Sequence, residues 1–463
     1  MRGEEEANMS SRKNRKGWTR RDVLGALGRT AALGVLGTGV GPAVLRAGAA
    51  TRDFNWRKHA GTSLRFCGWN ELWSMAMDKK VAEFEQVTGI KLNWEHLPQD
   101  QNRQKVQTEL TAKNKDLDLL WVAPHVEGVK YLRAGWLVPL DEFLGKPDLV
   151  PPDFDLQDFA PGFWNTCRMD GKMTTFPTVV EVACLMYRSD LLEKKGLKAP
   201  TTLEELEAAV AKLHDPPNVY GIVNRGTITQ APVTWSSYLY NFGGDYLDKN
   251  RQCAIHTPEA VRATDYYGRL HRQYGPPGIT TLNWPESSSV IAQGKAAFTS
   301  DNNNWRNIYD DPEKSKVVGK MAYALFPRGP AGNTPGIWTA GPSISAYSEK
   351  KEAAWYFIIW SLSKANQLYT HLSGIAATRR SAWQSPRYKE QEKNPAWAEV
   401  TLKTMEMSSK GYSPEVVSVM EVRNRVGEVI VKALQGVTGD ALRAEAAKAC
   451  ADITRILERT EKA

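Results

Sequence analysis

The chain has 463 residues, of which 42% are hydrophobic and 24% are charged, a composition typical of a soluble globular protein large enough for two cores. The net charge is +8, which could indicate an acidic partner. However, residues 1–49 contain nine Lys/Arg and four Asp/Glu, and the remaining residues contain 51 and 48. Because most of the surplus belongs to the first segment, the charge gives little support for nucleic-acid binding.

Residues 1–49 have the order of an export signal. Basic residues precede the twin-arginine pattern TRRDVL at 19–24, and a mildly apolar segment at 26–45 is followed by an Ala-Gly-Ala motif that ends at Ala49. A membrane anchor is the alternative, but Arg29 and the six glycines between Leu24 and Leu45 make this stretch a poor span. We therefore expect export by the twin-arginine route, cleavage near Ala49 and a periplasmic location.

The chain after this signal alternates predicted strands and helices. Strands are predicted at 63–68, 90–95 and 117–122, where apolar residues form short runs or alternate with polar ones. Between them, apolar residues recur at helical spacing from Trp73 until Gly89, and a polar helix follows around 101–113. This order predicts an α/β layer with a parallel sheet.

Polar and aromatic residues follow two of these strands. Trp69, Asn70 and Glu71 come after the first strand, and Trp121 and His125 lie at the end of the third. Ligands of open α/β sheets bind outside the carboxyl ends of the strands, so these five residues are candidate ligand contacts. For Trp121 a core position is equally compatible with the pattern, and a lone histidine such as His125 is more often an ordinary helix-start residue.

The middle of the chain, residues 163–196, combines a turn with a long apolar run. Asp-Gly-Lys at 170–172 predicts a β-hairpin. After Pro177, the run at 179–187 is broken by one charge, Glu181, and a run this apolar is expected to be buried on both faces. A buried carboxylate is costly unless it is paired or meets a polar ligand, so Glu181 is either a salt-bridged structural residue or a ligand contact.

A later predicted strand leads into a polar and aromatic cluster. The cluster consists of Asp301, Asn302, Asn303 and Trp305. Amide groups beside an indole suit recognition of hydroxyl groups, because they offer paired donors and acceptors with an apolar face. An ordinary helix cap is the alternative interpretation.

Several stretches resemble the family 1 solute-binding proteins of ABC importers. The motifs that carry the resemblance are the hairpin turn, Pro177, Tyr-Arg-Ser-Asp-Leu at 187–191, Gln-Gly-Lys-Ala-Ala-Phe at 293–298 and Lys-Glu-Ala-Ala-Trp at 351–355. The resemblance implies the α/β fold of a type II periplasmic binding protein, with two lobes joined by a multi-strand hinge and a ligand cleft between them. It divides the chain into a first lobe of 50–179 plus 340–409 and a second lobe of 180–339 plus 410–463.

The same resemblance suggests further cleft residues. It places Trp121 where the family carries an aromatic that stacks on sugar, and Trp305 where an aromatic meets the ligand. It puts Trp338 beside the hinge and Arg379 near the cleft, within GIAATRR at 374–380, where Ala377 replaces the usual proline. Trp235 near the start of a helix completes the candidate ligand-binding set.

Three classes of function are compatible with a secreted two-lobed protein. The first is a binding protein that delivers a small solute to an ABC permease. The second is a glycosidase that uses a carboxylate pair such as Glu71 and Glu181, and the third is a metal or siderophore carrier. The chain lacks the common catalytic motifs and any cluster at metal-ligand spacing. We therefore expect a binding protein without enzyme activity, cofactor or metal, acting as a monomer and binding no nucleic acid.

The solute is expected to be a sugar or polyol, bound by aromatic stacking and by hydrogen bonds to its hydroxyl groups. A cationic solute such as a polyamine or quaternary amine is the alternative, since tryptophan with Glu181 and Asp301 could hold a positive charge.

Five cysteines are present, so at least one thiol is unpaired. Cys167 and Cys184 flank the predicted hairpin and could pair, which spacing alone leaves open.

Overall fold

The computed structural model describes residues 54–160, 166–408 and 410–461. The predicted signal, residues 1–49, lies outside the described residues. Among the described residues, no helix has the length and apolarity needed to cross a membrane.

The first part of the chain forms the expected parallel layer. Strand β1 (Ser63–Trp69) pairs in parallel with β2 (Lys91–Leu97) on one side and with β3 (Leu119–Val122) on the other. The helix expected between the first two strands is present as α2 (Leu72–Asp78) and α3 (Val81–Thr88). The polar helix α4 (Gln99–Thr111), the π-helical turn η1 (Pro124–Gly128), α5 (Val129–Arg133) and α6 (Asp141–Leu144) follow.

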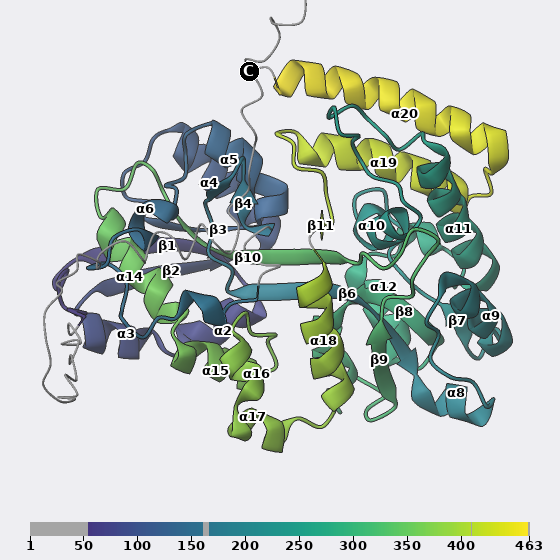
Figure 1. The fold of residues 1–463 in the computed structure, drawn as a ribbon, viewed down its shortest axis with the longest axis horizontal. Helices are drawn as coiled ribbons and strands as arrows, with labels where there is room; N and C mark the ends of the chain where they lie inside the picture. Colours follow the sequence, from purple (N-terminus) through teal and green to yellow (C-terminus); the bar gives the residue numbers. More distant parts are fainter. Residues whose placement is uncertain (1–53, 161–165, 409, 462–463) are drawn as a thin grey trace, which may run out of the picture. The chain divides into compact units, whose positions relative to one another are not determined.

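Two long strands continue this sheet into the rest of the molecule. Strands β6 (Val179–Arg188) and β10 (Gly336–Ile344) pair with each other in antiparallel fashion, and β10 also pairs with β3. The strand order is β2-β1-β3-β10-β6-β8-β7 within the described residues, with β9 on β6 and β11 on β10. Figure 1 shows β6 and β10 running side by side between the region of β1–β3 and the region of β8 and β9.

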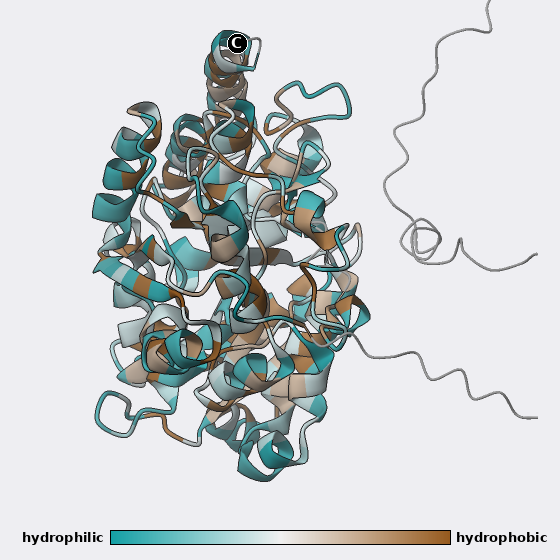
Figure 2. Ribbon diagram, turned by 90° about the vertical axis from the view of Figure 1, so that its left-hand side faces the viewer, coloured by the Kyte–Doolittle hydropathy of each residue, from teal (hydrophilic) through white to brown (hydrophobic). Residues whose placement is uncertain are grey.

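The rest of the chain adds four strands and a series of helices around both parts of this sheet. The strands are β7 (Tyr220–Ile222), β8 (Ala296–Asn302), β9 (Met321–Leu325) and β11 (Lys410–Gly411). The helices are α8 (Ser189–Lys194), α9 (Leu203–Leu213), α10 (Ala231–Asn241), α11 (Pro258–Tyr274), α12 (Trp284–Ala292), α13 (Arg306–Tyr309), α14 (Lys351–Ser361), α15 (Lys364–Leu372), α16 (Arg380–Gln384), α17 (Pro386–Gln391), α18 (Pro395–Met407), α19 (Val419–Leu434) and α20 (Gly439–Thr460). Many of these helices carry polar and apolar residues on different faces (Figure 2), as expected where one face packs on a core.

The apolar side chains gather into two large cores. One contains Phe66, Trp73 and the α14 residues Trp355 and Phe357, together with the apolar residues of β1 and β3. The other contains β6, β8, α10, α11, α19 and α20. The second core also includes Trp383, Trp397 and Met405 from α16 and α18. Residues 380–407 therefore pack with the second core, whereas the resemblance placed the whole of 340–409 in the first lobe.

The predicted hairpin is confirmed. Strands β4 (Arg168–Met169) and β5 (Lys172–Met173) pair in antiparallel fashion. Their two-residue turn has positive φ at both positions, 47° at Asp170 and 78° at Gly171. Turns of this kind match the twist of the strands they join, which explains the Asp-Gly pair.

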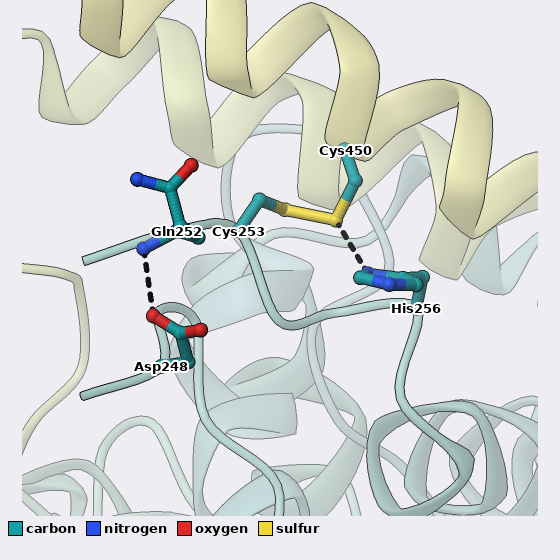
Figure 3. The surroundings of a disulfide bond; sticks show 5 residues. All are labelled: Asp248, Gln252, Cys253, His256 and Cys450. Atoms are coloured by element: carbon teal, nitrogen blue, oxygen red, sulfur yellow. Dashed lines mark hydrogen bonds between the residues drawn. A yellow bond between two sulfur atoms is a disulfide. The ribbon is translucent and has the colours of Figure 1, made fainter. Parts of the chain in front are cut away.

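The disulfide of the structure involves neither of the two cysteines beside the hairpin. Cys253 and Cys450 form a disulfide, 197 residues apart in the chain. Figure 3 shows this bond between the loop before α11 and helix α20, with His256 beside Cys450. Cys167 and Cys184 are free and buried, so the pairing considered for them is wrong.

Candidate functional site

Strands β6 and β10, which connect the two parts of the sheet, place a carboxyl group beside an aromatic ring. Glu181 of β6 and Trp338 of β10 are direct partners in the antiparallel register, so their side chains lie on the same face of the sheet. Trp338 in turn meets His125 edge to face, with ring centroids 5.6 Å apart. Since Trp338 packs against both large cores, this group lies where the two cores meet.

Glu181 keeps its proton to a higher pH than an ordinary glutamate. Burial is the main cause that raises its pKa, to about 7, and the negative charges of Asp301 and Glu71 act in the same direction. The side chain of Asn302 and the guanidinium of Arg225 offset part of this rise. Among the described residues, Glu181 has no ion-pair partner within salt-bridge distance. Near neutral pH, the carboxyl group of Glu181 can therefore either donate a hydrogen bond when protonated or only accept hydrogen bonds when ionised.

Asp301 is instead paired with Arg225, a residue outside the predicted set. Arg225 donates from Nε to Oδ2 of Asp301 at 2.8 Å and from Nη2 to Oδ1 at 2.7 Å. Both side chains are almost completely buried. The same guanidinium donates from Nη1 to Gln230 and lies 5.8 Å from the ring centroid of Trp305. The available signal was its position three residues after β7, near the same kind of strand end as the other candidates.

Aromatic residues occupy both sides of this region. Trp305 stacks on Trp284 with centroids 4.7 Å apart and planes 6° apart. At the end of β3, Trp121 lies 5.0 Å from Trp73 and 6.3 Å from Trp69. Trp121 is 2% exposed, so the core interpretation of this residue fits its burial, although its Nε1 has no hydrogen-bond partner among the described residues.

The end of β1 is organised by a helix cap. Glu71 accepts hydrogen bonds from the backbone of Trp73 at 2.8 Å and of Ser74 at 2.6 Å, which fixes the first turn of α2. Burial raises the pKa of Glu71. Both of its carboxylate oxygens are thus engaged in the cap, which argues against a catalytic pair with Glu181. Trp69 donates from Nε1 to Asn102 at 2.9 Å, and Asn70 is exposed.

Three sequence-predicted site residues have structural roles instead. Trp235 is buried in the second core and donates from Nε1 to Thr264 at 3.1 Å. Asn303 accepts from the backbone N–H of Val182 at 3.0 Å and donates to Thr401 at 2.9 Å. Arg379 is completely buried and donates to backbone carbonyls of Leu362, Asp155 and Phe154, with an ion pair to Asp158. The polar groups of these three side chains are engaged within the protein, which favours structural roles over contact with a ligand.

Other residues extend the region from the second core. Tyr412 follows β11. Burial is the largest cause that raises its pKa, and the negative charges of Glu181 and Asp301 raise it further. Arg423 of α19 is buried, and burial is the main cause that lowers its pKa, to about 10. The positive charges of Arg103 and Arg225 also lower this pKa, whereas Tyr246 raises it. Helix α19 contacts η1 of the first part of the chain. Arg423 also lowers the pKa of His125, although burial is the larger cause.

The region is rich in buried polar atoms without a partner among the described residues. They are Trp121 Nε1, Asn304 Oδ1, Trp305 Nε1, Tyr412 Oη and Arg423 Nε. Native proteins satisfy the great majority of buried polar atoms, so such a group of donors and acceptors indicates a binding site for a polar molecule. No cluster of three or more His, Cys, Asp or Glu that could hold a metal ion occurs among the described residues.

Comparison with known proteins identifies the family. Residues 74–368 match the family described as bacterial extracellular solute-binding protein. A mannitol-binding protein of Pseudomonas aeruginosa is 27% identical over 314 residues, which cover 66% of this chain and 70% of the relative. An erythritol/L-threitol-binding protein of Mycolicibacterium smegmatis is 24% identical over 384 residues, which cover 78% of this chain and 80% of the relative.

A solved structure agrees in fold. An ABC transporter solute-binding protein of Agrobacterium radiobacter K84, in complex with ribitol, superposes with a TM-score of 0.76 at 27% identity, covering 86% of this chain and 99% of that one. This likeness confirms the expected α/β fold of a type II periplasmic binding protein. With a family match over more than half of its length, the chain belongs to the bacterial extracellular solute-binding proteins.

Proposed function

We propose that this protein is the exported solute-binding component of an ABC importer and that its solute is an acyclic polyol. The observation that carries the proposal is the group of buried, unpartnered donors and acceptors around Glu181 and Asp301. The relatives named for mannitol and for erythritol/L-threitol, and the solved structure with ribitol, support the same solute class.

The charges of the site favour a neutral solute with many hydroxyl groups. Each hydroxyl both donates and accepts, so one chain of hydroxyls satisfies a donor such as Arg423 Nε and an acceptor such as Asn304 Oδ1. Burial raises the pKa of Glu181 to about 7, so it is only partly ionised at neutral pH, and Asp301 is already paired with Arg225. A cationic solute would therefore find no unpaired carboxylate of full charge and would approach the buried Arg423.

We propose that binding works through movement of two lobes about strands β6 and β10. The lobes are proposed as 54–179 with 340–379 and 180–339 with 380–461, since the two cores divide near these residues. Site residues come from both, with His125 from the first and Arg225 and Arg423 from the second. A solute that contacts both lobes binds the closed form better, and it therefore shifts the open–closed equilibrium toward closure.

The location and partner follow from the same proposal. The signal pattern in residues 1–49 supports twin-arginine export, cleavage near Ala49 and a periplasmic location. The closed protein would present its solute to the transmembrane subunits of an ABC permease, and the protein would act as a monomer.

The proposal is tested by calorimetry and thermal unfolding of the mature protein with D-mannitol, ribitol and erythritol. Maltose, glucose, spermidine and choline serve as comparison solutes. A solute at about 100 times its Kd should add roughly 2.7 kcal/mol to the free energy of unfolding. Binding of at least one polyol, and not of the cations, is expected. Binding of only the cyclic sugars or only the cations would overturn the solute class.

A further inference from the structure

A group of charged side chains joins the first lobe to the end of the last helix. Arg133 ends α5, whose Tyr131 packs with β3 residues in the first lobe. Its Nη1 donates to Oε2 of Glu461 at 2.7 Å, directly after α20. Its Nε and Nη2 donate to the two carboxylate oxygens of Asp170 in the hairpin turn, at 2.8 and 3.2 Å. Arg133 therefore bridges a carboxylate of its own lobe and one from the other lobe.

Glu461 is held in place by its own lobe. Its Oε1 accepts from the backbone N–H of Val417 at 2.7 Å, and its Oε2 accepts from Nη2 of Arg251 at 3.3 Å. Arg251 also donates to the backbone carbonyl of Glu415 at 2.6 Å. The side chain of Glu461 is 17% exposed. Its carboxylate is thus oriented toward Arg133 by contacts that do not depend on the first lobe.

The disulfide connects the segment that carries Arg251 to the helix that ends beside Glu461. Cys253 lies two residues after Arg251, and Cys450 lies in the helix that ends next to Glu461. Figure 3 shows the bond tying the loop to α20, with Gln252 held by Asp248 on the same loop. Apolar side chains of α20 also belong to the second core. The end of α20 is therefore anchored to the second lobe.

We propose that Arg133 and Glu461 form a latch that stabilises the closed arrangement of the lobes and slows release of the solute. Each partner is bound to its own lobe, so opening separates the two charges without rearranging either anchor. This inference rests on the proposed function, because it assigns the latch to the closed state of solute binding. A partly exposed ion pair contributes little energy, and we expect it to change Kd by about 2- to 5-fold.

The experiment compares Arg133→Gln, Glu461→Gln and the double variant with the wild type. The control is Glu421→Gln, which removes the ion pair between Glu421 and Arg459 inside the second lobe, close to the same end of α20. Each single latch variant should raise Kd for the bound polyol about 2- to 5-fold, through faster dissociation in stopped-flow measurements. The double variant should show no further loss, and the control should bind like the wild type.

Salt and scattering separate a latch from a general structural defect. High salt screens an exposed ion pair, so the difference between wild type and latch variants should shrink as salt is added. Small-angle scattering of the solute-free proteins should give a larger radius of gyration for the latch variants than for the control. The thermal midpoints without solute identify any variant that has lost folding stability.

The outcomes distinguish the two proposals. If the wild type binds none of the polyols, the proposed function fails, and scattering still tests the latch. If the wild type binds a polyol while the latch variants keep its Kd, its dissociation rate and the radius of gyration, the latch is overturned.

Discussion

Arg225 and Asp301, 76 residues apart in the chain, form a two-point ion pair that is almost completely buried beside Glu181. The pair fixes the carboxylate of Asp301, whereas Glu181 has no ionic partner among the described residues. Two carboxyl groups in the same site thus have different surroundings, because only one of them has its own arginine, and burial raises the pKa of the other, Glu181.

The ion pair should be necessary both for stability and for the solute site. Arg225→Ala leaves the buried charge of Asp301 uncompensated, so the free energy of unfolding should fall by about 3 kcal/mol, measured by urea titration. The double variant Arg225→Met/Asp301→Leu should recover most of this stability, because the buried charge is gone, but not polyol binding. Recovery of binding in the double variant would show that the pair only fills space.

Glu181 should make stability depend on pH in a defined direction. Its pKa in the folded protein, about 7, lies above the value expected in the unfolded chain. Between these two values the folded state binds more protons, so this group lowers stability as pH rises from about 4.5 to about 7. Glu181→Gln should therefore gain stability relative to the wild type between pH 5 and pH 8, measured by urea titration at each pH.

An exposed acid of the second lobe provides the control for this measurement. Glu204→Gln on α9 removes one carboxyl group at an exposed position and should follow the wild-type pH profile. If Glu181→Gln also follows that profile, Glu181 titrates like an ordinary carboxyl group, and the interpretation of its neutral state is wrong.

Local patterns were sufficient for the elements and for part of the site. The strands β1 to β3, the hairpin and the long strand β6 follow from apolar periodicity and turn residues. Glu71 follows β1 and Glu181 lies within β6, as expected. Family motifs at the hairpin, β6, β8 and α14 added the expectation of a two-lobed fold. These features are recorded in short stretches of sequence, which is why they could be predicted.

Residue type alone did not show which side chains face the site. Trp235 belongs to α10, a helix buried along its whole length. The guanidinium of Arg379 donates hydrogen bonds to the backbone carbonyls of residues 154, 155 and 362. Arg225 and the disulfide between Cys253 and Cys450 depend on partners far away in the chain. Such pairings are set by tertiary packing, and a single sequence contains no local signal for them.

The disulfide should contribute substantially to stability. It closes a segment of 197 residues, and the restriction it imposes on the unfolded chain corresponds to about 2–5 kcal/mol. Reductant should lower the thermal midpoint of the wild type but leave Cys253→Ser/Cys450→Ser unchanged. Thiol titration of the denatured, unreduced mature chain should find the three free cysteines, Cys67, Cys167 and Cys184. Five thiols before reduction would contradict the pairing.

Two tryptophans should separate stability from solute binding. Trp305 stacks on Trp284 next to the guanidinium of Arg225, and its Nε1 has no partner among the described residues. Trp235 is buried in the second core. Trp305→Ala should weaken polyol binding about tenfold, since it removes a stacking face and a donor. Trp235→Leu should lower the free energy of unfolding by about 2–4 kcal/mol through the cavity it leaves, with little change in Kd.

Calorimetry with the bound polyol and urea titration of the same preparations give both quantities for each variant. The expected result is a crossed pattern, with Kd changed by Trp305→Ala and stability changed by Trp235→Leu. Equal loss of affinity in both variants would place Trp235 in the site after all, against its hydrogen bond to Thr264. Unchanged affinity in Trp305→Ala would remove the second-lobe tryptophan from the site and leave solute recognition to the polar groups around Glu181.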